Sequence, residues 1–264
     1  MLLSIITVNL NNLEGLARTF ESVPRQAPED WEWIIIDGGS TDGSKEYIER
    51  RADRFAYWCS EADKGVYNAM NKGVRHAKGK YCLFLNSGDH FYNEKSLSLA
   101  LKAARERTAQ SDCDIIAFDL VIDNDPLHKY QRVKDSLSAA FFRSNTLPHP
   151  STLIKTELLR QTPYREDVKI VADWYFFFEQ IAVRKRSYTA VHRPLAVFYS
   201  GGISGNTPLR RREMEELLRS HYPEACRPSA NAPRGSITQG AKEWVYNNIL
   251  IYINFAIRKL RHIV

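Results

Sequence analysis

The chain is poor in cysteine. Its four cysteines, Cys59, Cys82, Cys113 and Cys226, lie far apart, and no Cys-x-x-Cys pair occurs among the 264 residues. A disulfide framework or a cysteine-based zinc site needs closely spaced cysteines. Neither is therefore expected, and a reducing compartment fits the sequence better.

Long hydrophobic runs are also missing. No stretch of about 18 apolar residues occurs, so no segment is expected to span a membrane as a helix. The amino-terminal sequence MLLSIITVNLNN lacks the basic start and the long apolar core of a signal peptide. We expect this segment to form a strand and the protein to be cytoplasmic.

Net charge is small except at the carboxyl end. The chain carries +6 overall, and residues 201–264 hold ten Lys and Arg against five Glu, a surplus of +5. A nucleic-acid-binding protein more often carries positive charge across a whole face. The basic end favours contact with an anionic surface there, and nucleic-acid binding remains a less favoured alternative.

With 44% hydrophobic and 26% charged residues, the composition is that of a globular protein. In the first half of the chain, apolar β-branched runs alternate with helical segments. The pattern predicts strands at 2–8, 31–36, 55–59, 81–85 and 115–121, and helices at 13–23, 44–51, 66–77 and 97–108. This alternation predicts an α/β fold with a mostly parallel sheet flanked by helices.

Polar side chains follow four of these strands, namely Asn9, Asp37, Asp63, and Asn86 with Asp89. The carboxyl ends of parallel strands meet at one edge of the sheet, where such folds bind ligands. Each aspartate alone is equally explained as a helix cap, but capping does not require every strand end to be polar. Together they favour a nucleotide site at which Mg²⁺ or Mn²⁺ arrives with the phosphates.

Other phosphate-handling motifs are absent. The segment DGGSTDG at 37–43 lacks the G-x-G-x-x-G spacing of dinucleotide-binding folds, and no P-loop lysine motif occurs. A phosphatase of the haloacid dehalogenase type would need an Asp in place of Gly39. These three classes are not expected.

After residue 122 the alternation weakens. The sequence predicts a loop or hairpin at 123–134, strands at 151–154 and 195–199, and helices at 171–183 and 207–221. Residues 223–240 are rich in Pro, Ser, Ala and Gly, which predicts a linker, and 241–264 are predicted to form an amphipathic helical appendage.

Several motifs, in order along the chain, resemble one enzyme family. They are SIITVNLNN, IIIDGGSTDGS and SEADKGVYNAMNKGVRHAKGKYCLFLNSGD within residues 2–90, and then LPHPSTLIK, VADWYFF and GGIS. In these motifs the chain resembles the inverting family 2 glycosyltransferases, especially bacterial exopolysaccharide enzymes of the colanic-acid type. The resemblance implies a GT-A fold, which is Rossmann-like, and a UDP- or GDP-linked sugar donor.

The resemblance also implies roles for the strand ends. The residues that match the family's donor pocket are Thr7, Asn9, Asp37, Asp63 and Lys64. The segment Asn86-Ser87-Gly88-Asp89 matches the family's Asp-x-Asp region, in which Asp89 corresponds to the ligand of Mn²⁺ or Mg²⁺. Gly88 stands where the family usually has the carboxylate that meets the ribose, and Asn86 replaces the first Asp.

Asp173 matches the family's catalytic aspartate, although Ala172 replaces the acid that often precedes it. An inverting transfer needs a carboxylate that accepts the proton of the acceptor hydroxyl as its oxygen attacks the anomeric carbon. We expect the aromatic neighbours of Asp173 to raise its pKa by desolvation. From the residues alone, a helix N-cap is the favoured explanation.

His149 lies between Pro148 and Pro150 and matches the histidine of the family's H-x-S segment. A single histidine is more often structural than catalytic. The resemblance makes His149 a second catalytic candidate, near the donor phosphates or the acceptor.

We expect residues 1–222 to form the catalytic domain, with 1–122 binding the donor and 123–222 holding the acceptor and the base. The helix at 241–264 either packs on this domain or lies in an anionic membrane surface, where Arg258, Lys259 and Arg261 would meet headgroups. The resulting prediction is a metal-dependent glycosyltransferase, peripheral on the inner face of the cell membrane, acting on a lipid-linked saccharide. A sugar-nucleotide nucleotidyltransferase is the enzyme alternative.

Overall fold

The computed structural model describes residues 1–23, 30–123, 128–199 and 207–222. The predicted linker at 223–240, the predicted helix at 241–264 and the GGIS segment lie outside the described residues. In the described ranges, no helix is both long enough and apolar enough to cross a membrane.

A single mixed sheet organises the unit Met1–His221. Its strand order is β3-β2-β1-β4-β8-β6-β9-β5, and β7 pairs with β6. The strands are β1 Leu3–Asn9, β2 Trp31–Asp37, β3 Tyr57–Ser60, β4 Tyr81–Phe84, β5 His90–Phe91, β6 Ile115–Asp123, β7 Lys129–Gln131, β8 Thr152–Lys155 and β9 Tyr188–Tyr199.

The direction of the strands differs between the two halves of the chain. Strands β3, β2, β1 and β4 are parallel, as the sequence predicts. Strand β8 is antiparallel to both β4 and β6, and β5 is antiparallel to β9. The α/β class is confirmed, but the sheet is parallel only in its first half and mixed beyond it.

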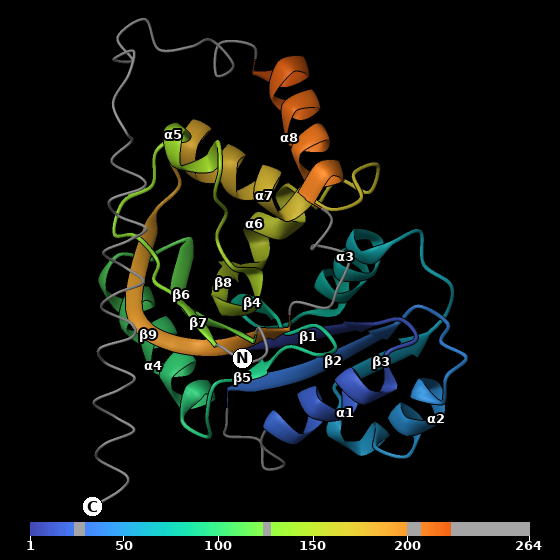
Figure 1. The fold of residues 1–264 in the computed structure, drawn as a ribbon. Helices are drawn as coiled ribbons and strands as arrows, with labels where there is room; N and C mark the ends of the chain where they lie inside the picture. The colour runs from blue at the N-terminus through green and yellow to red at the C-terminus, as the bar shows by residue number, and fades with distance from the viewer. Residues whose placement is uncertain (24–29, 124–127, 200–206, 223–264) are drawn as a thin grey trace, which may run out of the picture. The chain divides into compact units, whose positions relative to one another are not determined.

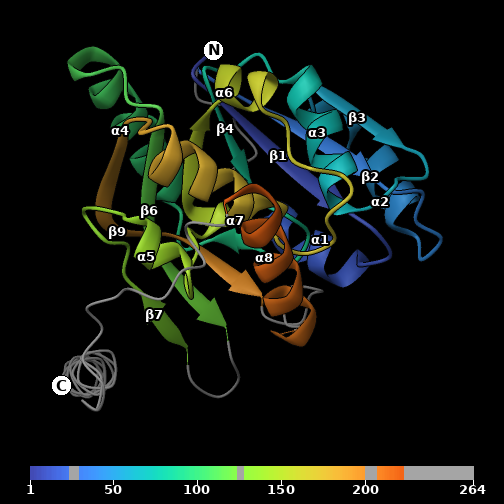
Figure 2. The ribbon, with the colours of Figure 1, turned by 90° about the horizontal axis from the view of Figure 1, so that it is seen from above.

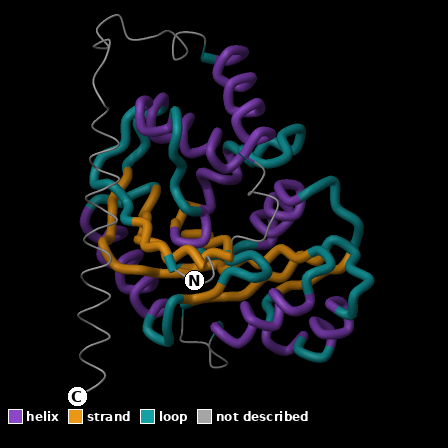
Figure 3. Tube along the Cα trace, in the orientation of Figure 1, coloured by secondary structure: helices purple, strands orange, loops and turns teal. Residues whose placement is uncertain are grey.

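Helices cover both faces of this sheet (Figure 1). Helices α1, α2 and α4 lie on one face, and α3, α6, α7 and α8 lie on the other, as Figure 3 also shows in colours for helix and strand. The bounds are α1 Leu13–Ser22, α2 Ser44–Glu49, α3 Val66–His76, α4 Ser96–Gln110, α5 Ala139–Phe142, α6 Thr156–Gln161, α7 Ala172–Phe177 and α8 Thr207–His221.

The alternation of side chains along β1 explains the two layers. Leu3 and Ile5 belong to the buried apolar cluster that also contains Leu16 and Phe20 of α1. Ile6 faces the other way, toward α3, where a Cβ on Gly73 would lie 2.4 Å from Ile6 Cγ2. Glycine at this position therefore lets α3 pack unusually close to the sheet, which brings its side chains near the ends of the strands.

The aromatic segment and the last strand depart from their predicted forms. The segment expected as one helix at 171–183 is an α-helix to Phe177 followed by a π-helical turn at Phe178–Val183. Strand β9 begins at Tyr188, well before the expected residue 195. Its pairing with β6 passes Pro194 at a register shift, and such a bulge tolerates a proline that would otherwise interrupt a strand.

Candidate active site

Asp37 is the centre of a buried hydrogen-bond cluster where β1, β2 and β3 end. Its Oδ1 accepts hydrogen bonds from Asn9 Nδ2 at 2.8 Å and Ser40 Oγ at 2.6 Å, and its Oδ2 accepts from Ser60 Oγ at 2.6 Å and the Ser40 backbone N–H at 2.9 Å. Asp37 is fully buried. The structure thus brings Asn9 and Asp37 together, as predicted, and adds two serines that sequence reasoning missed.

The charge on Asp37 is stabilised where it lies. Burial by itself raises the pKa of Asp37, but the hydrogen bonds from Ser40, Ser60 and Asn9 outweigh burial and hold its pKa below the ordinary value. Asp37 therefore serves first as an ionised clamp that joins three strand ends.

Thr7 does not reach the surface of the site. It is fully buried, its hydroxyl donates to the Leu85 carbonyl at 2.7 Å, and it accepts from Trp33 Nε1 at 3.0 Å. In this conformation Thr7 ties β1 to Leu85, the residue after β4, and its buried side chain offers no exposed group at the strand ends.

Asp63 lies beside the Asp37 cluster. A Cβ on Gly38 would lie 3.2 Å from Asp63 Oδ2, so a side chain at position 38 would crowd this carboxylate. Lys72 of α3 holds both Asp63, at 2.5 Å, and Glu61, at 2.7 Å. Lys64 is exposed next to Asp63. The sequence motif contained Lys72, but only the fold shows that it fixes Asp63.

The loop after β4 is held by Thr19 of α1. Its hydroxyl contacts the Asp89 carbonyl at 2.7 Å, the Asn86 carbonyl at 3.2 Å and the Gly88 N–H at 3.0 Å. Gly88 has φ +103°, and a Cβ there would lie 3.3 Å from the Tyr199 ring. A residue with a side chain rarely adopts this backbone, so the replacement of the family's usual carboxylate by Gly88 matches the local conformation.

His149 joins the two predicted carboxylates into one network. Its Nδ1 lies 3.2 Å from Asp173 Oδ2, and its Nε2 lies 3.8 Å from Asp89 Oδ2 and 3.3 Å from Asn86 Nδ2. Asp89 is also fixed by the Tyr199 backbone N–H, which donates to Oδ1 at 3.1 Å. Residues from three distant parts of the sequence thus meet within one hydrogen-bond chain.

The charges in this network follow from the contacts. Burial lowers the pKa of His149, but its contacts with Asp173 and Asp89 outweigh burial and raise the pKa to about 9. Burial raises the pKa of Asp173, but the hydrogen bond and charge of His149, with a further hydrogen bond from Tyr67, lower it overall. The expected increase in the pKa of Asp173 is therefore wrong, because two donors outweigh the effect of the aromatic enclosure.

Tyr67 of α3 is the positioning group that the sequence did not single out. Its hydroxyl lies 2.8 Å from Asp173 Oδ1 and 2.6 Å from the Ile170 carbonyl. The Trp174 N–H donates to the same Asp173 oxygen at 2.9 Å. Both Asp173 oxygens are thus held by hydrogen bonds. Tyr67 can reach Asp173 because α3 packs closely on the sheet.

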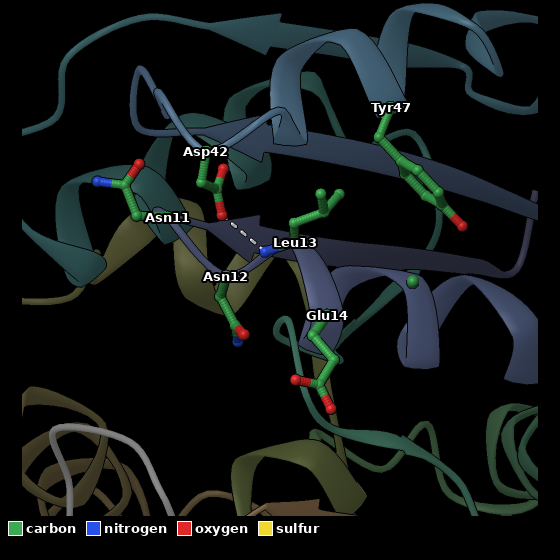
Figure 4. Close-up of a pocket in the computed structure, with 7 residues that line it drawn as sticks. Asn11, Asn12, Leu13, Glu14, Asp42 and Tyr47 are labelled. Atoms are coloured by element: carbon green, nitrogen blue, oxygen red, sulfur yellow. Dashed lines mark hydrogen bonds between the residues drawn. The ribbon is translucent and has the colours of Figure 1, made fainter.

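Two hollows lie near these residues. One of about 260 Å³ is lined mainly by apolar side chains, with His149 and Asp173 in its wall. The other is wide and shallow, lies where α1 and α2 begin, and is lined by Asn11, Asn12, Leu13, Glu14, Ala17, Asp42 and Tyr47 (Figure 4). Only the first contains members of the His149 network, and we take that one as part of the candidate site.

The loop 86–89 offers few ligands for a metal ion. Asp89 Oδ2 and His149 Nε2 are neighbours, and Asn86 Oδ1 is buried without a hydrogen-bond partner in the described residues. In those residues, no group of three His, Cys, Asp or Glu side chains converges on one point. The carboxylate of Asp89 and the carboxamide oxygen of Asn86 suit a hard divalent cation that takes its remaining ligands from phosphates.

Comparisons with known proteins agree with this fold. The fold is that of GT-A glycosyltransferases. The S. aureus TarS fragment 1–349, solved with UDP-GlcNAc, superposes with a TM-score of 0.66 at 17% identity, over 83% of this chain and 66% of that one. The mannosyltransferase PcManGT from Pyrobaculum calidifontis, solved with GDP-Man and Mn²⁺, superposes with a TM-score of 0.59 at 18% identity, over 88% of this chain and 65% of that one.

The sequence profile of Glycosyl transferase family 2 matches residues 4–173, and the chain belongs to this family. An uncharacterized glycosyltransferase of Mycobacterium tuberculosis is 32% identical over 68% of this chain and 69% of its own length. A PGL/p-HBAD biosynthesis glycosyltransferase of Mycobacterium bovis is 28% identical over 66% and 67%. TuaG of Bacillus subtilis, which is named as a teichuronic acid biosynthesis glycosyltransferase, is 31% identical over 55% of this chain and 58% of its own length.

Substituting Asp37→Asn tests the role of the buried clamp. The variant should lose about 1–3 kcal/mol of unfolding free energy at pH 7, because its amide cannot accept all the donors that surround it. The pKa of Asp37 is lower when folded, so its contribution is present above the unfolded pKa of about 4 and is lost as pH falls through the folded value. Urea unfolding of both proteins from pH 7 to pH 3 should show that the difference in their unfolding free energies decreases as pH falls. A difference that increases toward pH 3 would contradict the role of Asp37 as an ionised clamp.

Tyr67→Phe should lower stability through its lost contacts with Asp173 and Ile170, by about 1–2 kcal/mol. Tyr164→Phe is the matched control, because the two rings lie 5.6 Å apart and the buried Tyr164 hydroxyl has no partner in the described residues. That variant should be as stable as the parent or more stable. Urea unfolding at pH 7 measures both, and equal losses would show that the Tyr67 hydroxyl has no special contact.

Proposed function

We propose that the protein is an inverting glycosyltransferase, which moves a sugar from a UDP- or GDP-sugar to a lipid-linked saccharide during cell-surface polysaccharide synthesis. The observation that carries the proposal is the meeting of Asp173 and Asp89 at His149, between the polar strand ends and the apolar hollow. Leaving-group stabilisation and base catalysis need such groups on opposite sides of a sugar ring.

The donor side of the proposal uses the strand ends. Asn9, Asp37 and Asp63 lie at this edge of the sheet, and the fold neighbours TarS and PcManGT were solved with UDP-GlcNAc and with GDP-Man, which supports a nucleotide-sugar donor. Asp63, held by Lys72, is the carboxylate best placed to read the base. Both carboxylate oxygens of Asp37 already accept hydrogen bonds within the chain, and Asp37 stabilises this edge of the sheet through them.

Asp173 is proposed as the base. It lies in the wall of the hollow, where an acceptor hydroxyl would approach it. Its low pKa makes it a weak base at rest, so its strength must change as His149 changes its contact or charge during the reaction. His149, with a pKa of about 9, carries positive charge at neutral pH, and this charge lies on the side of Asp89, where the diphosphate would leave.

A divalent cation would be held by Asp89 together with the donor diphosphate, with the carboxamide oxygen Asn86 Oδ1 as a neighbouring neutral oxygen. Such a cation would neutralise the negative charge that develops on the leaving diphosphate. PcManGT is described with Mn²⁺, which supports the choice of a divalent metal. Its identity here remains a proposal.

The acceptor assignment draws on relatives. Two of them carry names from PGL and teichuronic acid biosynthesis, which supports a saccharide of the cell surface. The lipid-linked acceptor and the membrane contact through 241–264 remain predictions from the sequence. No feature of the described residues favours the nucleotidyltransferase alternative, which would release pyrophosphate.

A nucleotide titration tests the donor and the metal. UDP or GDP should raise the melting temperature with Mn²⁺ or Mg²⁺ and raise it far less with EDTA, because the diphosphate then lacks its counter-charge. Asp89→Ala should give only the small rise in melting temperature that is expected with EDTA, at any concentration of Mn²⁺ or Mg²⁺. Equal shifts with and without EDTA would contradict the metal, and no shift with any nucleotide would contradict the donor.

Asp173→Asn keeps the shape of the side chain and removes its ability to accept a proton. Transfer should fall by about 10²–10⁴-fold with nucleotide affinity nearly unchanged. Asp167→Asn is the control, since Asp167 is an exposed aspartate of the same segment, paired with Arg165, and its variant should keep parental turnover. Normal turnover in the Asp173 variant would remove it from the role of base.

A further inference from the structure

We infer that the apolar hollow beside Asp173 is an acceptor subsite that selects a saccharide bearing a negatively charged group, and that Arg210 of α8 binds this group. The inference rests on the proposed glycosyl transfer and adds the charge class of the acceptor to it. It is carried by the position of Arg210 in the wall of the hollow.

The hollow lies on the acceptor side of the network. Its lining includes His149 and Asp173 but none of the residues predicted to bind the donor, such as Asn9, Asp63 and Asp89. A molecule bound there would therefore meet Asp173 from the side away from the strand ends. The volume of about 260 Å³ suits one sugar ring rather than a whole nucleotide-sugar.

The walls of the hollow are suited to the apolar faces of a sugar. They include Trp174, Phe198, Leu120 and Ile122. The Trp174 indole is fixed by its Nε1, which donates to the Phe142 carbonyl at 2.7 Å. A ring that packs on such walls needs separate polar contacts to fix its orientation.

Arg210 is the one arginine or lysine among the described residues that line this hollow. It is half-buried, and within the described part of the chain it makes no ion pair or hydrogen bond. The only carboxylate in the lining, Asp173, is already held by His149, Tyr67 and Trp174. Among the described residues, no carboxylate therefore occupies the guanidinium, and we propose that it takes the anionic group of the acceptor.

The helix that carries Arg210 is fixed against the wall of the hollow. Glu213, one turn further along α8, accepts hydrogen bonds from the backbone N–H groups of Lys169 at 3.0 Å and Ile170 at 2.9 Å. Met214 and Leu217 of the same helix are buried. Ile170 also lines the hollow, so this contact holds Arg210 at a set place on its rim (Figure 2 shows α8 beside α7).

An arginine in this setting selects an oxyanion. Its planar fork matches a phosphate or a carboxylate in two parallel hydrogen bonds, and these are stronger than hydrogen bonds between neutral groups. The acceptor would carry its anionic group either as a sugar phosphate, as in a lipid diphosphate linkage, or as the carboxylate of a uronic acid.

Three monosaccharide probes test the inference with the full chain. Methyl β-glucoside is neutral, methyl β-glucuronide carries a carboxylate and glucose 1-phosphate carries a phosphate. Each is titrated by calorimetry with saturating UDP or GDP and Mn²⁺ present, so that the phosphate probe does not fill the donor site. At least one anionic probe should bind about tenfold or more tightly than the neutral probe, and the tighter of the two identifies the source of the charge.

Arg210→Gln should remove this preference and bring the anionic probes to the affinity of the neutral one. Arg211→Gln is the matched control, because Arg211 is the next residue on α8 and is exposed, and its variant should keep the preference. Equal affinities for all three probes in the parent protein, absence of binding by all of them, or an unchanged preference in Arg210→Gln would overturn the inference.

The nucleotide titration separates this result from the proposed function. Parental affinity for UDP or GDP in Arg210→Gln is expected, since Arg210 is not among the residues proposed to bind the donor. If nucleotide affinity in Arg210→Gln falls by the same factor as the preference for anionic over neutral probes, Arg210 binds the donor and the inference is wrong. The glycosyltransferase proposal stands in that case. If no nucleotide binds the parent protein, the proposed function fails whatever the probes show.

Discussion

Strand β8 is the constraint on which the site depends. It pairs with β4 on one side and β6 on the other, antiparallel to both. An antiparallel strand begins where its neighbour ends, so the turn His149–Ser151 before β8 lies beside the loop 86–89 that follows β4. This one pairing brings His149 to Asn86 and Asp89, and it makes one sheet out of both halves of the chain.

The close packing of α3 on β1 is the second requirement. Gly73 allows the helix to lie against Ile6, and α3 then serves both sides of the site. Lys72 holds Asp63 at the edge where β1, β2 and β3 end, and Tyr67 holds Asp173. Asn71 of the same helix binds the backbone of Tyr164 through both atoms of its amide. A displacement of α3 would therefore disturb the positions of Asp63 and Asp173 together.

The electrostatic balance shows why residue type alone does not set reactivity. Asp37 and Asp89 are buried and Asp173 is partly buried, yet the partners of these three aspartates differ. Asp37 has four donors from its own chain, and Asp173 shares its charge with His149 and Tyr67. Desolvation alone would favour the protonated acid in both cases, and it is the supplied hydrogen bonds that keep these groups ionised.

The local elements and the polar strand ends can be predicted from the amino-acid sequence alone. Alternating apolar runs fix β1, β2, β4 and the helices between them, because period and turn residues are local properties. They place Asn9, Asp37 and Asp63 at one edge without knowledge of the rest. The tertiary structure alone decided that Thr7 is buried, that β9 extends past Pro194 and that Asp173 has a lowered pKa. Each of these depends on partners far along the chain, such as Trp33, β6 and His149, and neither propensity nor spacing encodes which distant groups will meet.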